Sequence, residues 1–478
     1  MQVPLRLLSA EDMQAIHDAA LRVLAATGML VDHEKAREIL AAAGAHVNHD
    51  TKMVRFPPEL VEAKLKLVPR ETVYHGRTPE FDFTLSAAGP IYSRVAGGAT
   101  HYYDLETGQN RRGTLADWRQ FCTLVDALPQ IHSVATMHCG DVPAATADLH
   151  SLLTLYECQR KVIVHNAFSF QNAQRMIEMA LALRGSKEAV AQRPPYRHML
   201  SPISPLFLNE DDTAQLLLCC EYGIPTDIPI MPTAATTSPI TLAGTLMQSL
   251  AEYLGTMTLA QCARPGHNMP FFVDPVVADL RTSTPQFAAP EVGLLCAAIC
   301  QMGVEFYGLA PEAIGLDSDG FTHDQTLFQK AQNTIFQVMA GGKLVIGAGL
   351  VESSFALDPA QLVLDNEIMV IAKRWVKGFA VNADTLAVDA LTRVGPRGNF
   401  LIDDHTLKFL RSGELIRVDL FARERRDVWE SKGAKGPMDA ARDKAKTLLA
   451  KHEVPRLEDA VARELRAIVA AADAALVG

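Results

Sequence analysis

One stretch of the sequence decides the fold class: residues 315–367 read GLDSDGFTHDQTLFQKAQNTIFQVMAGGKLVIGAGLVESSFALDPAQLVLDNE. Apolar residues recur at helical spacing over residues 327–339, and the glycine pair that starts at Gly341 stops this predicted helix. A β-branched run at residues 344–346 predicts a buried strand, and a second helix is expected to begin at Asp358. A helix, a buried strand and a helix in this order are typical of a parallel β/α fold.

The loop that follows this strand is the natural place for a functional site. It carries Gly347, Gly349 and Glu352. In parallel β/α folds ligands gather at the carboxyl ends of the strands. The glycines could equally serve only a tight turn between strand and helix, and the pattern alone leaves both interpretations open.

Composition and charge limit the classes of function that the protein can have. The chain has 478 residues, of which 48% are hydrophobic and 21% are charged, as in a globular protein with a large core. A formal net charge of -10 argues against a nucleic-acid-binding protein, because phosphate binding needs a basic face. The sequence lacks an 18-residue apolar run and the apolar core of a signal peptide, so we expect a cytoplasmic protein without a membrane partner.

The cysteine pattern gives no sign of a metal or disulfide framework. The chain has 8 cysteines, and no two of them form a CxxC pair. Most are expected to be small buried hydrophobic residues. We therefore expect no bound metal that is needed for activity.

The N-terminal part, residues 1–115, is expected to form a cap of helices and short strands. Ser9 resembles the first residue of a capping box, a second helix is predicted around residues 34–43, and the proline pair that starts at Pro57 begins a third. Between residues 73 and 108 short β-like pieces are separated by Gly and Pro. This pattern predicts a small antiparallel element.

From residue 116 to residue 422, short apolar strands alternate with helices of ten to twenty residues. Eight units favour a closed (β/α)₈ barrel of the TIM type over an open sheet, so the expected fold class is α/β. The remaining residues, 423–478, are expected to form a helical tail with a solvated surface. The predicted strands lie at residues 133–138, 162–168, 198–202, 228–233, 270–274, 304–308 and 344–349, with a weaker eighth at 378–381.

In such a barrel the residues that end each strand converge on one mouth. Their side chains include carboxylates and aromatic rings but few basic groups, which suits a bound cation and does not suit a phosphate ester. Nucleotide-binding, GxSxG and HExxH motifs are absent from the sequence, and no catalytic residue is assigned. The candidate substrate-binding residues are His165, Asn166, Phe168, Thr236, Phe272, Asp274, Tyr307, Asp317 and Glu352.

Several short motifs follow one another along the whole chain: DLETG at residues 104–108, RGTLAD at 112–117, PITLAG at 239–244, DLRT at 279–282, GAG at 347–349 and LVLDNE at 362–367. On these motifs the chain resembles the trimethylamine methyltransferase superfamily, the corrinoid-dependent amine methyltransferases. The archaeal trimethylamine enzymes of that family carry pyrrolysine, whereas this sequence contains only standard residues. The chain is therefore similar to the non-pyrrolysine branch, which includes glycine betaine methyltransferases.

The resemblance implies an enzyme that moves a methyl group from a small quaternary, betaine-like amine to the Co(I) of a separate cognate corrinoid protein. Cobalamin would be supplied on that partner, so no tightly bound cofactor is expected. A quaternary nitrogen already bears the charge that makes its methyl group transferable, and its leaving group is a neutral amine. The protein's task is therefore to position and desolvate the substrate.

The chemistry of a quaternary, betaine-like amine suggests three roles for the candidate residues. The rings that could surround the ammonium group are Phe168, Phe272 and Tyr307, the carboxylates that could provide the countercharge are Asp274, Asp317 and Glu352, and the donors for a betaine carboxylate are His165, Asn166 and Thr236.

Three alternatives stay open. The first is a tertiary methylamine:corrinoid methyltransferase on the same scaffold, and the second uses zinc to activate a thiol acceptor, against which the scattered His and Cys residues count. The third is a betaine-binding or regulatory protein without turnover. The apolar terminal segments also suggest a homo-oligomer.

Overall fold

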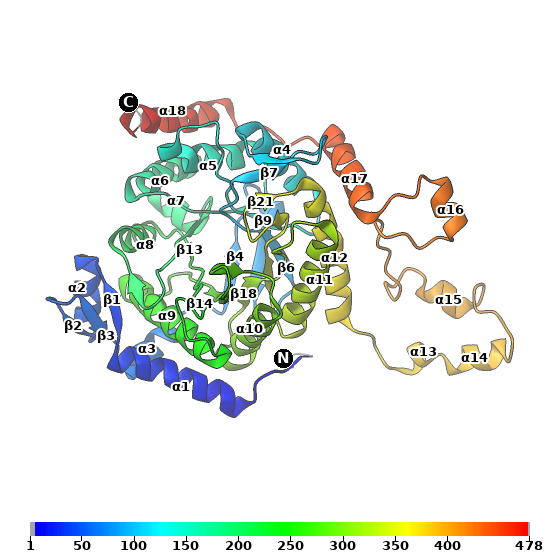
Figure 1. Cartoon of the computed structure of the whole chain (residues 1–478), viewed down its shortest axis with the longest axis horizontal. Coiled ribbons are helices and arrows are strands. Elements are labelled where there is room, and N and C mark those ends of the chain that lie inside the picture. The colour runs from blue at the N-terminus through cyan, green and yellow to red at the C-terminus, as the bar shows by residue number, and fades with distance from the viewer. Residues whose placement is uncertain (1–4, 477–478) are drawn as a thin grey trace.

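The computed structural model describes residues 5–476, and at its centre lies a sheet of eight parallel strands (Figure 1). The last strand pairs with the first, and an isolated bridge between Ile230 and Val273 spans the remaining gap. The sheet is therefore a nearly closed barrel, and the predicted fold class is confirmed. In chain order the strands are β6 (Tyr92–Val95), β9 (Ser133–Val134), β10 (Val162–His165), β11 (Arg197–Met199), β13 (Thr226–Asp227), β15 (Phe271–Phe272), β18 (Pro311–Ile314) and β19 (Leu344–Ile346).

One long helix follows each barrel strand, which gives the full set of eight β/α units. Most of α9 is buried on all sides, because the barrel covers one side and the N-terminal helices cover the other. Among residues 5–476, no helix is long and apolar enough to cross a membrane. The eight helices are α4 (Leu115–Ala127), α5 (Ala147–Cys158), α6 (Phe170–Arg184), α8 (Glu210–Tyr222), α9 (Leu242–Ala263), α10 (Pro290–Gln301), α11 (His323–Met339) and α12 (Pro359–Lys377).

Two of the eight predicted strands were wrong. Residues 304–308 continue α10 as a π-helical turn, Met302–Tyr307, and the chain leaves it at Gly308 with φ 62° before β18 begins at Pro311. Residues 378–381 lie beyond the last barrel helix and form no strand. Two barrel strands were therefore missed: β6, which the sequence placed among the antiparallel pieces, and β18, which begins just after the wrongly predicted strand at residues 304–308.

The N-terminal helices agree with the prediction. They are α1 (Ala10–Ala26), α2 (Glu34–Ala42) and α3 (Pro58–Leu65), and the Ser9 capping box opens the first. Helices α1, α2 and α3 all pack against α9. Gly28 ends the first helix with φ 77°, and a side chain there would meet the carbonyl oxygen of Val54. Beside these helices lie β1 (Met29–Val31), β2 (His46–Asn48) and β3 (Met53–Arg55), with β12 (Phe207–Leu208) at the edge.

The predicted antiparallel element is present as two separate hairpins. The first joins β4 (Glu71–Tyr74) to β5 (Phe83–Ser86), and the second joins β7 (His101–Tyr103) to β8 (Asn110–Arg112). Strand β6 lies between them in sequence but belongs to the barrel. The division into a cap, a barrel and a tail at residues 116 and 423 stays a prediction, although the first barrel strand precedes residue 116.

The C-terminal tail packs on the barrel, which corrects the expectation of a solvated surface. Helix α17 (Pro437–Lys451) packs on α12 and α4, and α18 (Asp459–Leu476) packs on α5 and α6. Their apolar faces bury Ala441, Leu465 and Val469. The charged residues of the tail form only the outer face of these helices.

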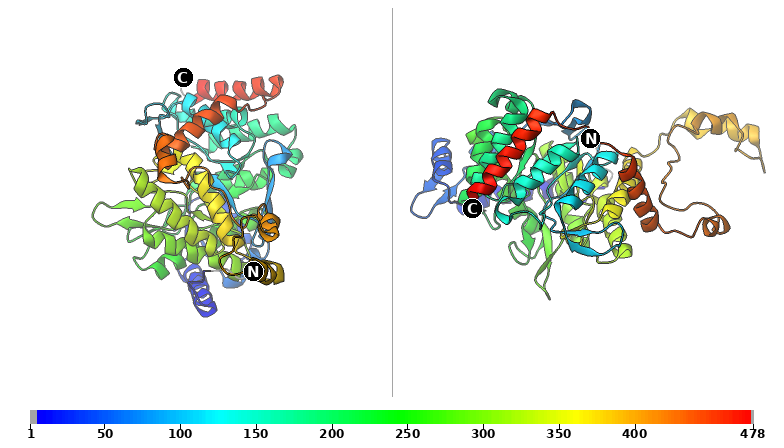
Figure 2. Two further views of the ribbon diagram at one scale, coloured as in Figure 1. Left: turned by 90° about the vertical axis from the view of Figure 1, so that its right-hand side faces the viewer. Right: turned by 90° about the horizontal axis from the view of Figure 1, so that it is seen from above.

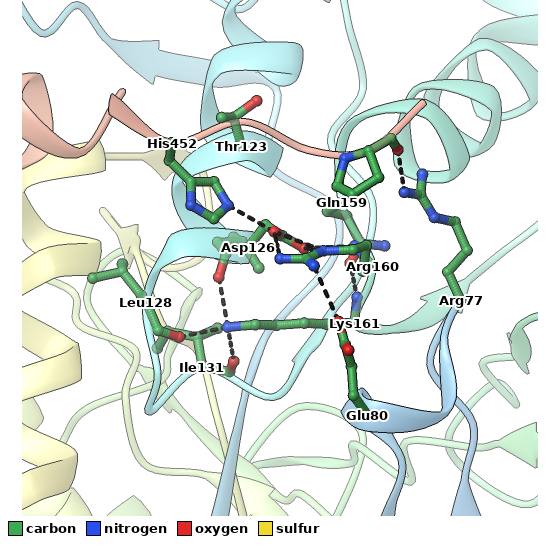
Figure 3. A network of polar contacts seen from close by, with 12 residues as sticks. Arg77, Glu80, Thr123, Asp126, Leu128, Ile131, Gln159, Arg160, Lys161 and His452 are labelled. Carbon is green, nitrogen blue, oxygen red and sulfur yellow. Dashed lines mark hydrogen bonds and ion pairs between the residues drawn. The ribbon is translucent and has the colours of Figure 1, made fainter. Parts of the chain in front are cut away.

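A polar network fastens the tail to the end of the barrel where the strands begin (Figure 3). The Asp126 carboxylate, at the end of α4, is shielded from solvent. It accepts hydrogen bonds from the backbone N–H of Arg160 at 2.7 Å and from its Nη2 at 2.8 Å. Nε2 of His452 lies 2.7 Å from the same carboxylate. Burial raises the pKa of Asp126, but the hydrogen bonds from Arg160 and His452 outweigh burial and lower it below its usual range.

A second buried cation completes this end of the barrel. Lys161 Nζ donates to the carbonyl oxygens of Val125 at 2.7 Å and Ile131 at 2.5 Å, and also to that of Leu128. These carbonyl groups lie at the end of α4 and just before β9. The Lys161 side chain therefore joins the end of α4 to the segment that leads into β9.

We expect Asp126→Asn to lower the free energy of unfolding by about 3–5 kcal/mol, because it removes one partner of a buried ion pair. The Asp126 contribution should be present above about pH 4 and should fall away at lower pH, because its pKa is lowered in the folded protein. Urea unfolding at pH 7 and pH 3 measures both effects.

The matched control is Glu80→Gln, since Glu80 pairs with the same Arg160 at 3.0 Å but is 61% exposed. That change should cost about 1 kcal/mol or less. Equal losses in the two variants would contradict the role given to Asp126.

Candidate substrate-binding site

A cavity of about 350 Å³ lies at the carboxyl ends of the barrel strands. Its size fits a small organic molecule. Three of the predicted residues, Asn166, Phe272 and Asp274, line it. The other lining side chains used below are those of Arg94, His138 and Ser354.

Asp274 is the most unusual group in this cavity. It follows β15, is fully buried, and accepts a hydrogen bond through Oδ1 from the backbone N–H of Ile314 at 2.8 Å. Its other oxygen, Oδ2, has no hydrogen-bond partner among the described residues. Burial raises the pKa of Asp274 to about 7, against the opposing effect of the Ile314 hydrogen bond. The site therefore holds a carboxylate that can gain a positively charged partner.

Arg94 is a charged residue of the cavity that the sequence analysis did not name. It projects from β6, and the centre of its guanidinium lies 4.9 Å from the ring centroid of Phe272. Its Nη1 donates to Asp227 Oδ2 at 2.7 Å and lies 3.3 Å from Glu312 Oε2. The sequence signal for this residue was a charged side chain inside the apolar run PIYSRV.

The charges around the cavity floor are mostly acidic. Two buried arginines, Arg94 and Arg197, face three buried carboxylates, Asp227, Glu312 and Asp274, and the less buried Asp212 also lines the cavity. Arg197 Nε donates to Asp227 Oδ1 at 2.7 Å, and Arg94 is held by Asp227 and Glu312. Asp274 is thus the carboxylate whose charge these arginine contacts leave uncompensated, which favours a cationic ligand.

Neutral polar groups form another part of the wall. Asn166 Oδ1 and His138 Nδ1 are buried and have no hydrogen-bond partner within residues 5–476. Burial lowers the pKa of His138, and the nearby Arg112 lowers it further, so the imidazole is neutral at pH 7. The predicted residue Phe168 lies beside it at the rim, with 4.9 Å between the ring centroids.

Asp317 does not line the cavity but forms a hydrogen bond with a residue that does. It is fully buried, and it accepts a hydrogen bond from the hydroxyl of Ser354, which lines the cavity. Burial raises the pKa of Asp317 to about 6. The neighbouring Asp319 accepts from Ser353 Oγ at 2.8 Å and from the backbone N–H of Phe287 at 2.8 Å. These two carboxylates join three mouth loops.

The loop they hold has an unusual backbone. Glu352, Ser353 and Ser354 follow one another with φ values of 59°, 53° and 66°, which non-glycine residues rarely adopt. Glu352 itself is not among the residues that line the cavity, and its carboxylate accepts from the Tyr103 hydroxyl and from Asn110 Nδ2 at 2.9 Å. Of the predicted carboxylates, Asp274 therefore lines the cavity and Glu352 does not.

Three further predicted residues, like Phe168, Asp317 and Glu352, are not among the residues that line the cavity. His165 is fully buried, with Nδ1 2.8 Å from the carbonyl oxygen of Asn166. Thr236 is exposed and its hydroxyl donates to the carbonyl of Thr233 at 3.3 Å. Tyr307 lies in the π-helical turn before β18, at the other end of the barrel, and its hydroxyl is 2.9 Å from His17 Nδ1. Its predicted place at the mouth followed from the wrong strand at residues 304–308.

Metal binding has little support in the side-chain arrangement. Within the described chain, no group of three or more His, Cys, Asp or Glu side chains is placed to hold a metal ion. All eight cysteines are unpaired, and six of them are buried. The expectation that activity needs no bound metal stays a prediction.

Comparisons with known proteins agree with the resemblance found in the sequence. Residues 2–476 match the trimethylamine methyltransferase (MTTB) family. The chain is 29% identical to the trimethylamine methyltransferase MttB of Desulfitobacterium hafniense over 463 residues, which cover 96% of this chain and 92% of that protein. It is 28% identical to a glycine betaine methyltransferase of the same species over 423 residues, which cover 88% and 87% of the two chains.

Among solved structures, the monomethylamine methyltransferase of Methanosarcina barkeri is similar in fold. The TM-score is 0.53 at 10% identity, with 93% of this chain and 94% of that chain covered. At this identity the likeness concerns the fold alone.

We expect the affinity for a small cation to depend on the ionisation of Asp274. Below pH 7 the carboxyl group becomes protonated, so the dissociation constant for tetramethylammonium should rise up to tenfold per pH unit. Above pH 7 it should level off. Calorimetric titrations from pH 5 to pH 9 measure this profile.

The control is Asp274→Asn, which keeps the shape of the side chain and removes its charge. This variant should bind the cation weakly at every pH. A wild-type profile that is flat between pH 5 and pH 8 would remove Asp274 from the site.

Proposed function

This chain belongs to the trimethylamine methyltransferase family, and we propose that it transfers a methyl group from a small quaternary, betaine-like amine to a partner corrinoid protein. Its family relatives are methyltransferases, so the chain is assigned as an enzyme. The observation that carries the substrate proposal is the buried Asp274 carboxylate, whose Oδ2 has no partner among the described residues and which lines the cavity.

The mixed charge of the cavity supports a zwitterionic substrate. Asp274 would face the ammonium group, and a ring face of Phe272 would contribute a cation–π contact of about 0.5–2 kcal/mol. The substrate carboxylate would then lie toward Arg94, which lines the same cavity. An amine without a carboxylate would interact with Asp274 but would offer no group to Arg94.

The chain's own residues would position and desolvate the substrate. A quaternary nitrogen has no proton to lose and departs as a neutral amine, so no side chain has to act as a general acid. The corrinoid, when its carrier protein is docked, supplies the Co(I) nucleophile that accepts the methyl group. Removing water from the ammonium group strengthens its attraction to Asp274 and holds the methyl group in line for transfer.

The cofactor is proposed to stay on the partner protein. The cavity of about 350 Å³ suits a small amine and is too small for a corrinoid macrocycle. The barrel mouth also carries exposed apolar side chains on six different loops, which suits a docking surface. They are Phe168, Ile203, Ile240, Leu280, Phe321 and Phe355.

A tertiary methylamine is the second candidate substrate. Relatives named trimethylamine methyltransferases match this chain as well as the glycine betaine methyltransferase does, at 28–29% identity. A protonated trimethylamine would also pair with Asp274. It would have no carboxylate for Arg94, and this sequence contains no pyrrolysine.

We expect methyl transfer from a betaine and little or none from trimethylamine. The assay mixes the enzyme, a Co(I)-corrinoid protein and a panel of betaines, and follows the cobalt absorbance. Asp274→Asn should lower kcat/KM for the betaine 10- to 100-fold, equivalent to about 1.4–2.7 kcal/mol. Robust transfer from trimethylamine with none from any betaine would overturn the substrate proposal, and cation binding without any transfer would favour a binding protein.

We expect Phe321→Ala to raise the KM for the corrinoid protein and to leave amine binding unchanged, because Phe321 is exposed at the mouth and does not line the cavity. A several-fold rise is the expected size for one apolar contact in an interface. The control is Val73→Ala, an exposed apolar residue at the opposite end of the barrel. Equal effects of the two changes would argue against docking at the mouth.

A further inference from the structure

Residues 379–417 form an arm that stands away from the body of the protein (Figures 1 and 2). The arm contains the short helices α13 (Ala383–Leu386), α14 (Val388–Val394) and α15 (Asp404–Phe409), and it is followed by α16 (Arg426–Ser431). The right-hand view of Figure 2 shows it extending sideways from the end of α12. None of the proposed steps of methyl transfer uses this segment.

The arm exposes far more apolar surface than its length predicts. Of the 25 large hydrophobic residues that are exposed among residues 5–476, 11 lie within these 39 residues. Leu415 is 92% exposed, Ile402 is 84% and Phe379 is 79%. Such a concentration of apolar side chains marks an interaction surface.

Hydrogen bonds hold the arm at its root and near its tip. At its root, Arg374 Nη2 donates to the carbonyl of Glu414 at 3.0 Å, which ties the returning chain to α12. Beyond the arm, Val418 and Leu420 are buried in the body. Arg393 and Asp403 are joined by hydrogen bonds of 2.8 Å, so the chain on either side of the arm's tip is held together.

We propose that the arm packs against a second copy of this chain. A standard protein–protein interface takes about 800 Å² from each partner. Ten of the arm's apolar side chains are more than half exposed, and at on the order of 100 Å² each they offer roughly 1,000 Å². This exposed apolar area is comparable to what one partner of a standard interface buries.

The charge of the arm is compatible with a second copy. The arm carries five acidic and five basic residues, so its formal charge is zero, whereas the whole chain carries -10. In a two-fold symmetric contact each surface meets its own image, so a charged arm would repel itself and a neutral arm does not. The neutral arm thus lets two acidic chains associate.

The position of the arm argues against its use by the corrinoid partner. Helix α12 begins in the mouth loop after β19 and runs to the other end of the barrel. There Lys373 Nζ lies 2.7 Å from Oε1 of Gln130, a residue that precedes β9. The arm therefore leaves from the end opposite to the mouth, and a protein docked at the mouth would not reach it.

The test compares the mass of the full-length chain with that of a triple arm variant by analytical ultracentrifugation at 1–50 µM. We expect the wild type to sediment at twice 52.1 kDa or more. Ile402→Asp, Leu410→Asp and Leu415→Asp together should raise the dissociation constant at least 100-fold and give a monomer. The matched control places three Asp residues at the mouth, at Ile203, Ile240 and Leu280, and should keep the wild-type mass.

If the triple variant does not fold, a second measurement on the wild type tests whether the arm contacts a second copy. Lys408 is the arm's only lysine and is 57% exposed. Lysine cross-linking of a mixture of ¹⁴N- and ¹⁵N-labelled chains should give cross-links of Lys408 that contain both isotopes. A monomeric wild type, a folded arm variant of wild-type mass, or Lys408 cross-links within single chains alone would each overturn the proposal.

Discussion

Two arginines and two carboxylates meet inside the barrel, where each is almost fully shielded from solvent. Arg94 and Asp227 pair directly, Arg197 holds the other oxygen of Asp227, and Glu312 lies 3.3 Å from Arg94. The Tyr74 hydroxyl donates to Glu312 from the first hairpin. A buried charge without its partner costs several kcal/mol, so these contacts restrict how four barrel strands and the hairpin can be arranged.

The same arrangement explains the character of the site. Asp227 and Glu312 already form ion pairs with the two arginines, so Asp274 stays available to a ligand. Because Asp274 is buried without an ion-pair partner, its pKa is raised. The pairing inside the core therefore leaves one carboxyl oxygen of the cavity wall without a partner among the described residues.

The sequence predicted the barrel because most of its strands lie between long helices with clear start and stop signals. It misplaced two strands, because barrel strands here are only two to four residues long and give little periodicity. Residues 304–308 look like a strand, but they continue α10 until Gly308 ends the turn. Strand β6 was missed because antiparallel hairpins flank it on both sides.

The site was predictable where a residue directly follows a strand, as Asn166 and Asp274 do. It was not predictable for Asp317 and Glu352, because nothing local shows that their oxygens accept hydrogen bonds from residues 37 and 249 positions away. Arg94 was missed together with its strand. Loop-to-loop hydrogen bonds depend on the closed barrel, so they can be read only once the strand order is known.

Helix α12 connects the site to the proposed interface. Near its start, Asp365 accepts from Lys330 Nζ and from the backbone N–H of Gly349, both at 2.7 Å, which fixes the loop after β19. Near its end, Arg374 holds the root of the arm. One rigid helix is thus anchored at the mouth by a buried ion pair and at the far end by the arm. The loop that shapes the cavity and the proposed interface are thus fixed to opposite ends of the same helix.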